Sequence, residues 1–280
     1  MYTSLSPGAI GVRVSGLEEG LALACRHGFE GYHFSIGEAA ELGVERVREA
    51  VSRTGVRLSA WGFPVDFRGP EERYEQDMAR LGQLADVAAA LGVLRTATWI
   101  MPFSDQLSFD DNFRVHAERL RPAAALLAQR GIRLGLEYVA PATSRRGKRH
   151  PFVHTMAGMR QLCAAVGPNA GFLLDSWHWY TAHEGLAELR TLTAAEVVDV
   201  HLNDAPAGIA VDEQVDNVRA LPAQTGVIDL AGFLRTLRDT GYDGPVMVEP
   251  FSEEVRRMPP EEAVAATRAA LRRAWTQAGL

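Results

Sequence analysis

The sequence predicts a single (β/α)8 barrel of the α/β class over residues 1–280. Short apolar runs rich in β-forming residues alternate with longer amphipathic stretches along the whole chain, which is typical of repeated βα units. About eight units can be counted, and no GxGxxG phosphate loop follows the first strand candidate. We therefore favour one closed TIM barrel over an open, doubly wound sheet, and no linker suggests a second domain.

The strand candidates are apolar on both faces, as expected for a parallel sheet that is covered by helices. They are GAIGVRV from Gly8, GYHFSI from Gly31, VRLSAWGF from Val56, VLRTATWI from Val93, IRLGLEYV from Ile132, AGFLLDS from Ala170, VVDVHLND from Val197 and PVMVEPF from Pro245.

Amphipathic helix patterns separate these strands. They cover Leu17 to His27, Glu38 to Thr54, Pro70 to Leu91, Ser108 to Arg130, Thr155 to Val166, Leu186 to Leu192, Leu230 to Thr240 and Glu261 to Ala278. Several are followed by a glycine suited to the left-handed turn after a helix, namely Gly28, Gly55, Gly92, Gly131, Gly167 and Gly241.

The charge balance argues against a polyanionic partner. A formal net charge of -6 would repel DNA or RNA, so no nucleic acid partner is expected. One basic cluster, Arg145, Arg146, Lys148 and Arg149, is either a solvated loop or a clamp for an anionic group on a small substrate.

No segment has the length and apolar character of a membrane span, and the N-terminus lacks the pattern of a signal peptide. The two cysteines, Cys25 and Cys163, lack CxxC spacing and are expected to be buried, reduced thiols. We therefore expect a soluble, cytoplasmic protein with no membrane partner.

Ionisable residues stand at the ends of the last four strand candidates. LGLE places Glu137, FLLD places Asp175, VDVH places His201 and VMVE places Glu249. The carboxyl ends of barrel strands form the face that carries function, so these side chains should meet. Any one of them has a structural alternative, such as capping the next helix or pairing with an arginine.

Three buried carboxylates facing one another require compensation, and no lysine or arginine occupies a matching strand end. The simplest compensation is a divalent metal ion held by Glu137, Asp175, His201 and Glu249. Oxygen ligands with one imidazole favour Mn2+, while Mg2+, Co2+, Fe2+ and Zn2+ also suit the site.

Two further groups follow the strand ends. His178, three residues after Asp175, is either a proton donor beside the metal or a structural histidine. Several aromatic residues are placed either to wall the apolar side of a sugar ring or to fill the core: Phe34, Trp61, Phe63, Trp99, Trp177 and Trp179. The remaining histidines, His33 among them, show no partner spacing and are expected in the core or on the surface.

Five segments of the chain together resemble the xylose isomerase-like barrel superfamily. They are LGLEYV, FLLDSWHWY, VDVHLND, VRALPAQTG and VMVEPF. This superfamily includes sugar phosphate isomerases and epimerases, ketose 3-epimerases and inosose isomerases, with endonuclease IV as a distant relative. DSWHWY and HLNDAP are most similar to the inosose isomerase branch. The extra histidine ligands of the endonuclease branch are missing, which argues against DNA cleavage.

The resemblance implies that Glu137, Asp175, His201 and Glu249 bind the metal and that Glu137 and Glu249 also form an acid/base pair. It further implies that His178 and Arg219 steady the substrate oxygens. The usual Pro-Gly-acidic-Gly turn after this arginine is replaced by Pro222-Ala223-Gln224-Thr225-Gly226, which weakens the assignment of Arg219.

These observations lead to a metal-dependent sugar isomerase or epimerase as the expected function. A ketose, inosose or related polyol would exchange a proton through a metal-bound cis-enediolate, with one glutamate removing the proton and the other returning it. The alternatives are a metal-dependent lyase or dehydratase and, less favoured, a non-catalytic sugar-binding barrel. The substrate and its phosphorylation stay open, as does the oligomeric state, although members of the superfamily often form homo-oligomers.

Overall fold

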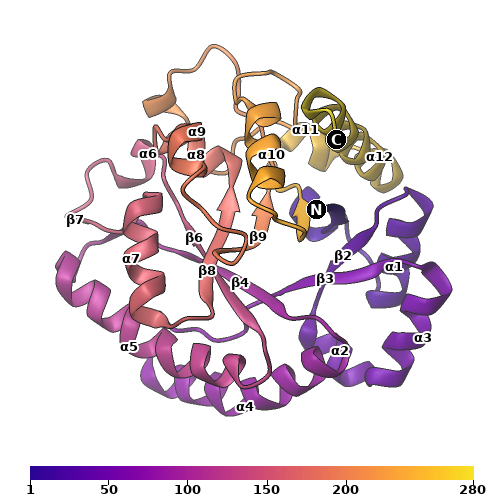
Figure 1. The fold of residues 1–280 in the computed structure, drawn as a ribbon, viewed down its shortest axis with the longest axis horizontal. Coiled ribbons are helices and arrows are strands. Elements are labelled where there is room, and N and C mark those ends of the chain that lie inside the picture. Colours follow the sequence, from indigo (N-terminus) through magenta and orange to yellow (C-terminus); the bar gives the residue numbers. More distant parts are fainter.

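Eight parallel strands close into a barrel in the computed structural model, which describes residues 1–280 (Figure 1). The order around the barrel is β1-β10-β9-β8-β6-β4-β3-β2, so each barrel strand pairs with its sequence neighbours. These strands are β1 (Tyr2–Leu5), β2 (Gly31–Phe34), β3 (Arg57–Gly62), β4 (Arg95–Ile100), β6 (Arg133–Tyr138), β8 (Ala170–Asp175), β9 (Val197–His201) and β10 (Pro245–Met247). Two short strands outside the barrel, β5 (Phe103–Ser104) and β7 (His150–Pro151), pair antiparallel. The predicted (β/α)8 barrel is confirmed.

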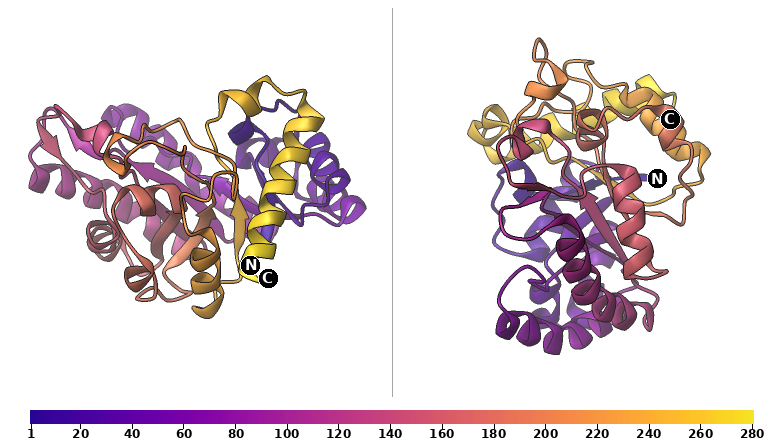
Figure 2. Two further views of the ribbon diagram at one scale, coloured as in Figure 1. Left: turned by 90° about the horizontal axis from the view of Figure 1, so that it is seen from above. Right: turned by 90° about the vertical axis from the view of Figure 1, so that its left-hand side faces the viewer.

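Helices surround the barrel, and the two termini lie close together (Figure 2). The helices are α1 (Leu17–Arg26), α2 (Ile36–Leu42), α3 (Val44–Thr54), α4 (Glu71–Ala90), α5 (Phe109–Ala128), α6 (Ala142–Arg145), α7 (Met156–Val166), α8 (Ser176–Thr181), α9 (Leu186–Leu189), α10 (Leu230–Asp239), α11 (Glu253–Arg257) and α12 (Pro260–Ala278). Two 3-10 turns, η1 (Gly8–Ile10) and η2 (Val211–Glu213), lie in the loops. None of the helices combines the length and apolar character needed to cross a membrane.

Helix α5 shows how the sequence specifies these elements. The side chain of Ser108 caps its first turn by accepting a hydrogen bond from the backbone N–H of Asp111. Leu120, Ala124 and Leu127 recur at helical spacing and are completely buried. Gly131 follows with a φ of 69°, a left-handed conformation that glycine adopts without strain.

The first strand differs from the prediction. We expected it in GAIGVRV from Gly8, but strand β1 is formed by Tyr2–Leu5, which pairs with β10 and β2. Residues 8–10 form η1, and Gly11 has a left-handed φ of 78°. Pro7 and Gly11 turn the chain away from the sheet because proline fixes φ and the left-handed residue cannot continue a strand.

The pattern from Glu38 to Thr54 forms two helices and not one. Gly43, with a φ of 85°, ends α2 and precedes α3. An interior glycine weakens a helix, and this one reverses the sign of φ, so the helical hydrogen bonds cannot continue across it.

The two cysteines lie in different environments. Cys163 on α7 is buried as expected, and burial raises the pKa of its thiol to about 12. Cys25 is exposed on α1, so its predicted burial is wrong. The helical period places Leu21 and Ala24 on the buried face of α1 and turns Cys25 outward beside Arg26.

Small residues allow the barrel to pack tightly below its C-terminal rim. A Cβ added at Gly135 on β6 would lie 3.1 Å from the Cβ of Ala97 and 3.2 Å from the backbone nitrogen of Leu173. The interior is therefore filled at this level, and a cavity opens above it at the carboxyl ends of the strands, where the ionisable residues lie.

Candidate functional site

The four predicted metal ligands lie together at the carboxyl ends of neighbouring strands. Glu137 is the penultimate residue of β6, Asp175 ends β8, His201 ends β9, and Glu249 follows β10 by two residues. Asp175 and His201 are direct partners in the sheet register. The barrel therefore places all four side chains on one rim, as the spacing of the strand ends predicted.

His201 lies at the centre of the three carboxylates. Its Nδ1 is 3.4 Å from Glu249 Oε2, 3.8 Å from Glu137 Oε1 and 3.9 Å from Asp175 Oδ2. All four side chains are largely withdrawn from solvent, although Glu249 keeps 24% of its side chain exposed, compared with 8% for Glu137. Three carboxylates thus surround one imidazole at distances too long for good hydrogen bonds.

Two of these ligand atoms are buried without any hydrogen-bond partner, namely Glu137 Oε1 and His201 Nδ1. Unpaired polar atoms are costly in a protein interior, so their convergence indicates a missing partner. Donor atoms of Asp175, His201 and Glu249 lie within 4.8 Å of one another, as do those of Glu137, Asp175 and His178. This donor set of carboxylate oxygens and imidazole suits a divalent cation.

Burial and the close approach of these groups shift their pKa values. Burial raises the pKa of Glu137 well above its usual value, and Asp175 and Glu249 raise it further. Burial by itself would lower the pKa of His201, but Glu249 and Glu137 outweigh it and raise that pKa to about 10. The three carboxylates therefore favour a positive charge between them.

Asp175 is held by three hydrogen bonds. Its Oδ1 accepts from the backbone N–H of Trp177 at 2.7 Å, which caps helix α8. Its Oδ2 accepts from Asn203 Nδ2 at 3.0 Å and from Arg219 Nη1 at 2.7 Å. Asn203 also accepts from the backbone N–H of Glu249 at 2.9 Å, so it links two predicted ligands.

Arg219 brings a positive charge to the carboxylates, although no lysine or arginine stands at a matching strand end. It comes from a loop, not from a strand end, and only 2% of its side chain is exposed. Arg219 neutralises Asp175, whereas the side chains of Glu137 and Glu249 have no lysine or arginine within hydrogen-bond distance. These two carboxylates still match the charge of one divalent ion.

Asp204 fixes the loop that carries Arg219. Its backbone exchanges two hydrogen bonds with Ala220, at 3.0 and 2.8 Å. Its carboxylate accepts from the backbone N–H groups of Thr225, Gly226 and Ile228 at 2.8 to 3.1 Å. The altered turn after Arg219 is therefore stabilised from the end of β9, and Arg219 reaches the site despite the unusual loop.

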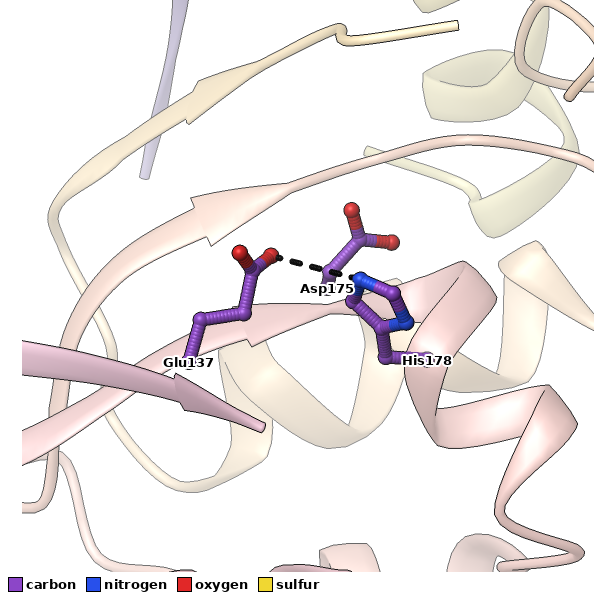
Figure 3. A group of neighbouring side chains, drawn as sticks. All are labelled: Glu137, Asp175 and His178. Atoms are coloured by element: carbon purple, nitrogen blue, oxygen red, sulfur yellow. Dashed lines mark ion pairs between the residues drawn. The ribbon is translucent and has the colours of Figure 1, made fainter. Parts of the chain in front are cut away.

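His178 lies between Arg219 and Glu137. Its Nε2 is 3.1 Å from Arg219 Nη2 and 3.9 Å from Glu137 Oε1, and Figure 3 shows the imidazole directed toward this carboxylate. Burial, followed by the charges of Arg219 and His201, lowers the pKa of His178 well below its usual value. The structure thus brings a neutral imidazole beside the predicted ligands.

A cavity of about 650 Å³ opens beside these residues. Three of the predicted aromatic residues line it, namely Phe34, Trp61 and Trp99. Trp177 and Trp179 are buried instead, and Phe63 packs against the core. This volume suits a small ring, with aromatic surface on one side and the ionisable cluster on the other.

The sequence interpretation missed a buried network in the wall of the cavity. His33 on β2 donates from Nε2 to Asp199 Oδ2 at 2.8 Å, and its Nδ1 is 2.9 Å from Ser4 Oγ. His33 is half-buried and lines the cavity together with Asp199, a position that its spacing in the sequence did not indicate. The available signal was the alternation in VDVH, which points Asp199 and His201 to the same side of β9.

The basic cluster around Arg145 lies outside the cavity lining. Arg145 donates to the backbone carbonyls of Ala140 and Pro141, and Arg146 pairs with Glu213 at 2.7 Å. These contacts favour the solvated loop over the substrate clamp.

Similarity to known proteins agrees with this architecture. A family model described as xylose isomerase-like TIM barrel matches residues 21–274. A 3-dehydroshikimate dehydratase from Pseudomonas putida is 28% identical over 223 residues, covering 79% of this chain and 33% of the relative. An inosose isomerase from Halalkalibacterium halodurans is 29% identical over 140 residues, covering 48% of this chain and 45% of the relative. The chain thus spans a third to a half of the length of these two curated relatives.

Two solved structures extend the similarity over the full barrel. A xylose isomerase domain protein from Alicyclobacillus acidocaldarius is 30% identical, with a TM-score of 0.87 and 100% of both chains covered. The IOLI protein with a bound zinc atom is 18% identical, with a TM-score of 0.80, covering 100% of this chain and 98% of its own. At that identity the second likeness concerns the fold alone. Taken with the rim of carboxylates and histidine, the match of the family model places this chain in the xylose isomerase-like TIM barrel family.

Proposed function

We propose that this protein is a divalent-metal-dependent isomerase or epimerase of a ketose, inosose or related polyol. The observation that carries the proposal is the pair of glutamates that approach His201 from strands on either side of it. Glu137 Oε1 and Glu249 Oε2 lie 3.8 and 3.4 Å from the same ring nitrogen, beside a cavity of the size of a small ring.

The proposed metal ligands are Glu137, Asp175, His201 and Glu249. The unpartnered Glu137 Oε1 and His201 Nδ1 support this assignment, as does the zinc atom named for the IOLI protein. When bound, the ion would act as a Lewis acid toward the carbonyl oxygen of the substrate. Carboxylate-rich ligation favours Mn2+ or Mg2+, and the imidazole also admits Co2+, Fe2+ or Zn2+.

Two glutamates serve as the acid/base pair in this proposal. Glu249, whose carboxylate is the more exposed to the cavity, removes the proton from the carbon beside the ketone. The electron pair of the broken C–H bond moves into a planar enediolate. For isomerisation, Glu137 gives its proton to the neighbouring carbon while the hydroxyl proton passes from one oxygen of the enediolate to the other. For epimerisation, Glu137 gives its proton to the opposite face of the same carbon.

In this proposal His178 faces the substrate oxygens, and Arg219 holds His178 and Asp175 in position. His178 and Arg219 both line the cavity and are almost fully buried, so their orientations are fixed by their surroundings. The rings of Trp177 and Phe251 each lie 4.9 Å from the Arg219 guanidinium and restrict its movement. Positioning by such rigid groups lowers the entropic part of the reaction barrier.

Exchange with deuterium oxide tests the proton transfer. Metal-loaded protein is incubated with candidate ketoses and inososes, and deuterium at the carbon beside the carbonyl is measured by mass spectrometry and NMR. Incorporation that accompanies turnover supports the proposal, and its loss in Glu249→Gln assigns the transfer to this site. Turnover without any incorporation would refute the enediolate.

A dehydratase is the second candidate, because one relative bears the name 3-dehydroshikimate dehydratase. The same proton removal by Glu249, followed by departure of a β-hydroxyl group as water, would give an unsaturated ketone. The mass of the product separates the candidates, since dehydration lowers it by one water and isomerisation conserves it.

A further inference from the structure

We infer that Asp216 makes this cavity selective for uncharged substrates by occupying the outer nitrogen of Arg219, so that carboxylate and phosphate groups find no free cation. The inference rests on the proposed function, because it specifies which ring compounds enter the site.

Both terminal nitrogens of Arg219 are already engaged. Nη1 donates to Asp175 Oδ2 at 2.7 Å and to the backbone carbonyl of Glu249 at 3.3 Å. Nη2 donates to Asp216 Oδ1 at 3.0 Å and lies 3.1 Å from His178 Nε2. Only Nε lacks a partner, and it is buried out of reach. An anion therefore has to displace Asp216 in order to bind Arg219.

The remaining charged groups of the cavity are unfavourable to an anion. Arg219 is the only lysine or arginine in the lining, which also contains the carboxylates of Glu137, Asp199, Asp216 and Glu249. Two other arginines stack on lining aromatic rings from outside the lining: Arg68 lies 4.0 Å from the ring centre of Trp99, and Arg256 lies 5.7 Å from that of Phe251. Four carboxylates line the cavity, whereas Arg219 and a bound divalent ion would supply three positive charges, so the acidic charge is still in excess by one.

Asp216 is placed to control this balance. One quarter of its side chain is exposed, and it lines the cavity, whereas Arg219 behind it is nearly completely buried. A substrate therefore meets the carboxylate of Asp216 before the guanidinium. A binding site discriminates strongly between two ligands when binding of one of them would leave a buried charge without a partner.

The test compares two ring compounds of similar size in the Mn2+-loaded protein, neutral myo-inositol and anionic shikimate. Dissociation constants are measured by calorimetry for the wild type, for Asp216→Asn and for Asp212→Asn. Asp212 is the matched control, because it is an exposed aspartate of the same loop region that pairs with His183 outside the cavity. Asp216→Asn leaves an isosteric amide and releases the charge of Arg219.

We expect the wild type to bind myo-inositol more tightly than shikimate. Asp216→Asn should tighten shikimate binding about tenfold, since it removes one nearby like charge, while changing myo-inositol binding by less than about threefold. Asp212→Asn should change neither. Three results would each overturn the inference: shikimate binding to the wild type as tightly as myo-inositol, an equal gain in both variants, or no measurable binding of myo-inositol.

The outcome is distinguishable from failure of the proposed function. If the wild type prefers myo-inositol but exchanges no deuterium into any neutral keto ring, the proposed reaction is wrong and the selectivity stands. If anionic 3-dehydroshikimate is turned over faster than an inosose, the selectivity is wrong while metal-dependent chemistry beside a ketone stands.

Discussion

Replacing Glu137 by glutamine should make the metal-free protein more stable at neutral pH while removing its stabilisation by metal. Burial and the neighbouring carboxylates raise the pKa of Glu137 well above 4.5. The native state therefore keeps a proton that the unfolded chain loses, and native stability falls as pH rises above about 4.5. Glutamine has nearly the same shape and does not titrate, so the variant escapes this loss.

A polar group that is buried without a hydrogen-bond partner costs about 1 to 3 kcal/mol, and Glu137 Oε1 is such a group. The variant should therefore gain about this much at pH 8, where the unfolded chain is ionised at this position, and little at pH 5. For 280 residues the entropy of unfolding is about 0.6 kcal/mol/K, which gives a rise in Tm of about 2 to 5 °C. Mn2+ at about 100 times its Kd should raise the Tm of the wild type by about 5 °C. The same concentration should raise the Tm of the variant by much less.

Thermal unfolding with EDTA and with Mn2+, at pH 5 and pH 8, measures both effects. Glu41→Gln on α2 is the control, because Glu41 is exposed and the same substitution there should change neither quantity. If the difference in Tm between the wild type and Glu137→Gln, measured with EDTA, is the same at both pH values, the argument from burial is refuted. If Mn2+ raises the Tm of the variant as much as that of the wild type, Glu137 is not a metal ligand.

Three further predictions concern the groups around the ligands. Asn203→Ala should weaken Mn2+ binding roughly tenfold to a hundredfold in a titration of the apo-protein, because Asp175 loses a hydrogen bond that orients it. Arg219→Gln should lower the free energy of unfolding in urea by about 3 to 5 kcal/mol without metal, with partial recovery on adding Mn2+. Although Asp199 is buried, His33 lowers its pKa. The free energy of unfolding of the wild type should therefore exceed that of Asp199→Asn above pH 4, and the excess should vanish as pH falls below 4. A difference in the free energy of unfolding that stays constant with pH would contradict the lowered pKa.

The rim of the barrel was predictable because it depends on strand order and little else. In a parallel barrel every strand ends on the same face, so a residue at a strand end is placed without knowledge of the loops. Glu137, Asp175 and His201 follow directly from this rule. We predicted the first strand at the wrong residues, but this did not change the predicted positions of Glu137 and Asp175. The first strand, Tyr2–Leu5, lies across the barrel from β6 and β8.

The environment of the rim was not predictable, because it depends on contacts between distant segments. Arg219 reaches Asp175 only because Asp204 holds the intervening loop, and no local pattern reports that contact. The bond between His33 and Asp199 joins β2 to β9, two strands that are not neighbours in the sheet. Single polar residues within apolar strands are ambiguous until the partner on the opposite wall is known.

Hydrogen bonding divides the carboxylates of the rim into two kinds. Asp175 accepts three hydrogen bonds and is paired with Arg219, so its position and its charge are both fixed. The carboxylates of Glu137 and Glu249 accept none, and one of them opens to the cavity. A group that only anchors a metal benefits from being fixed, whereas a group that exchanges protons with a substrate has to gain and lose one at little cost. In the proposed mechanism Asp175 is therefore a ligand alone, and Glu137 and Glu249 also move protons, a distinction that four similar strand ends in the sequence do not reveal.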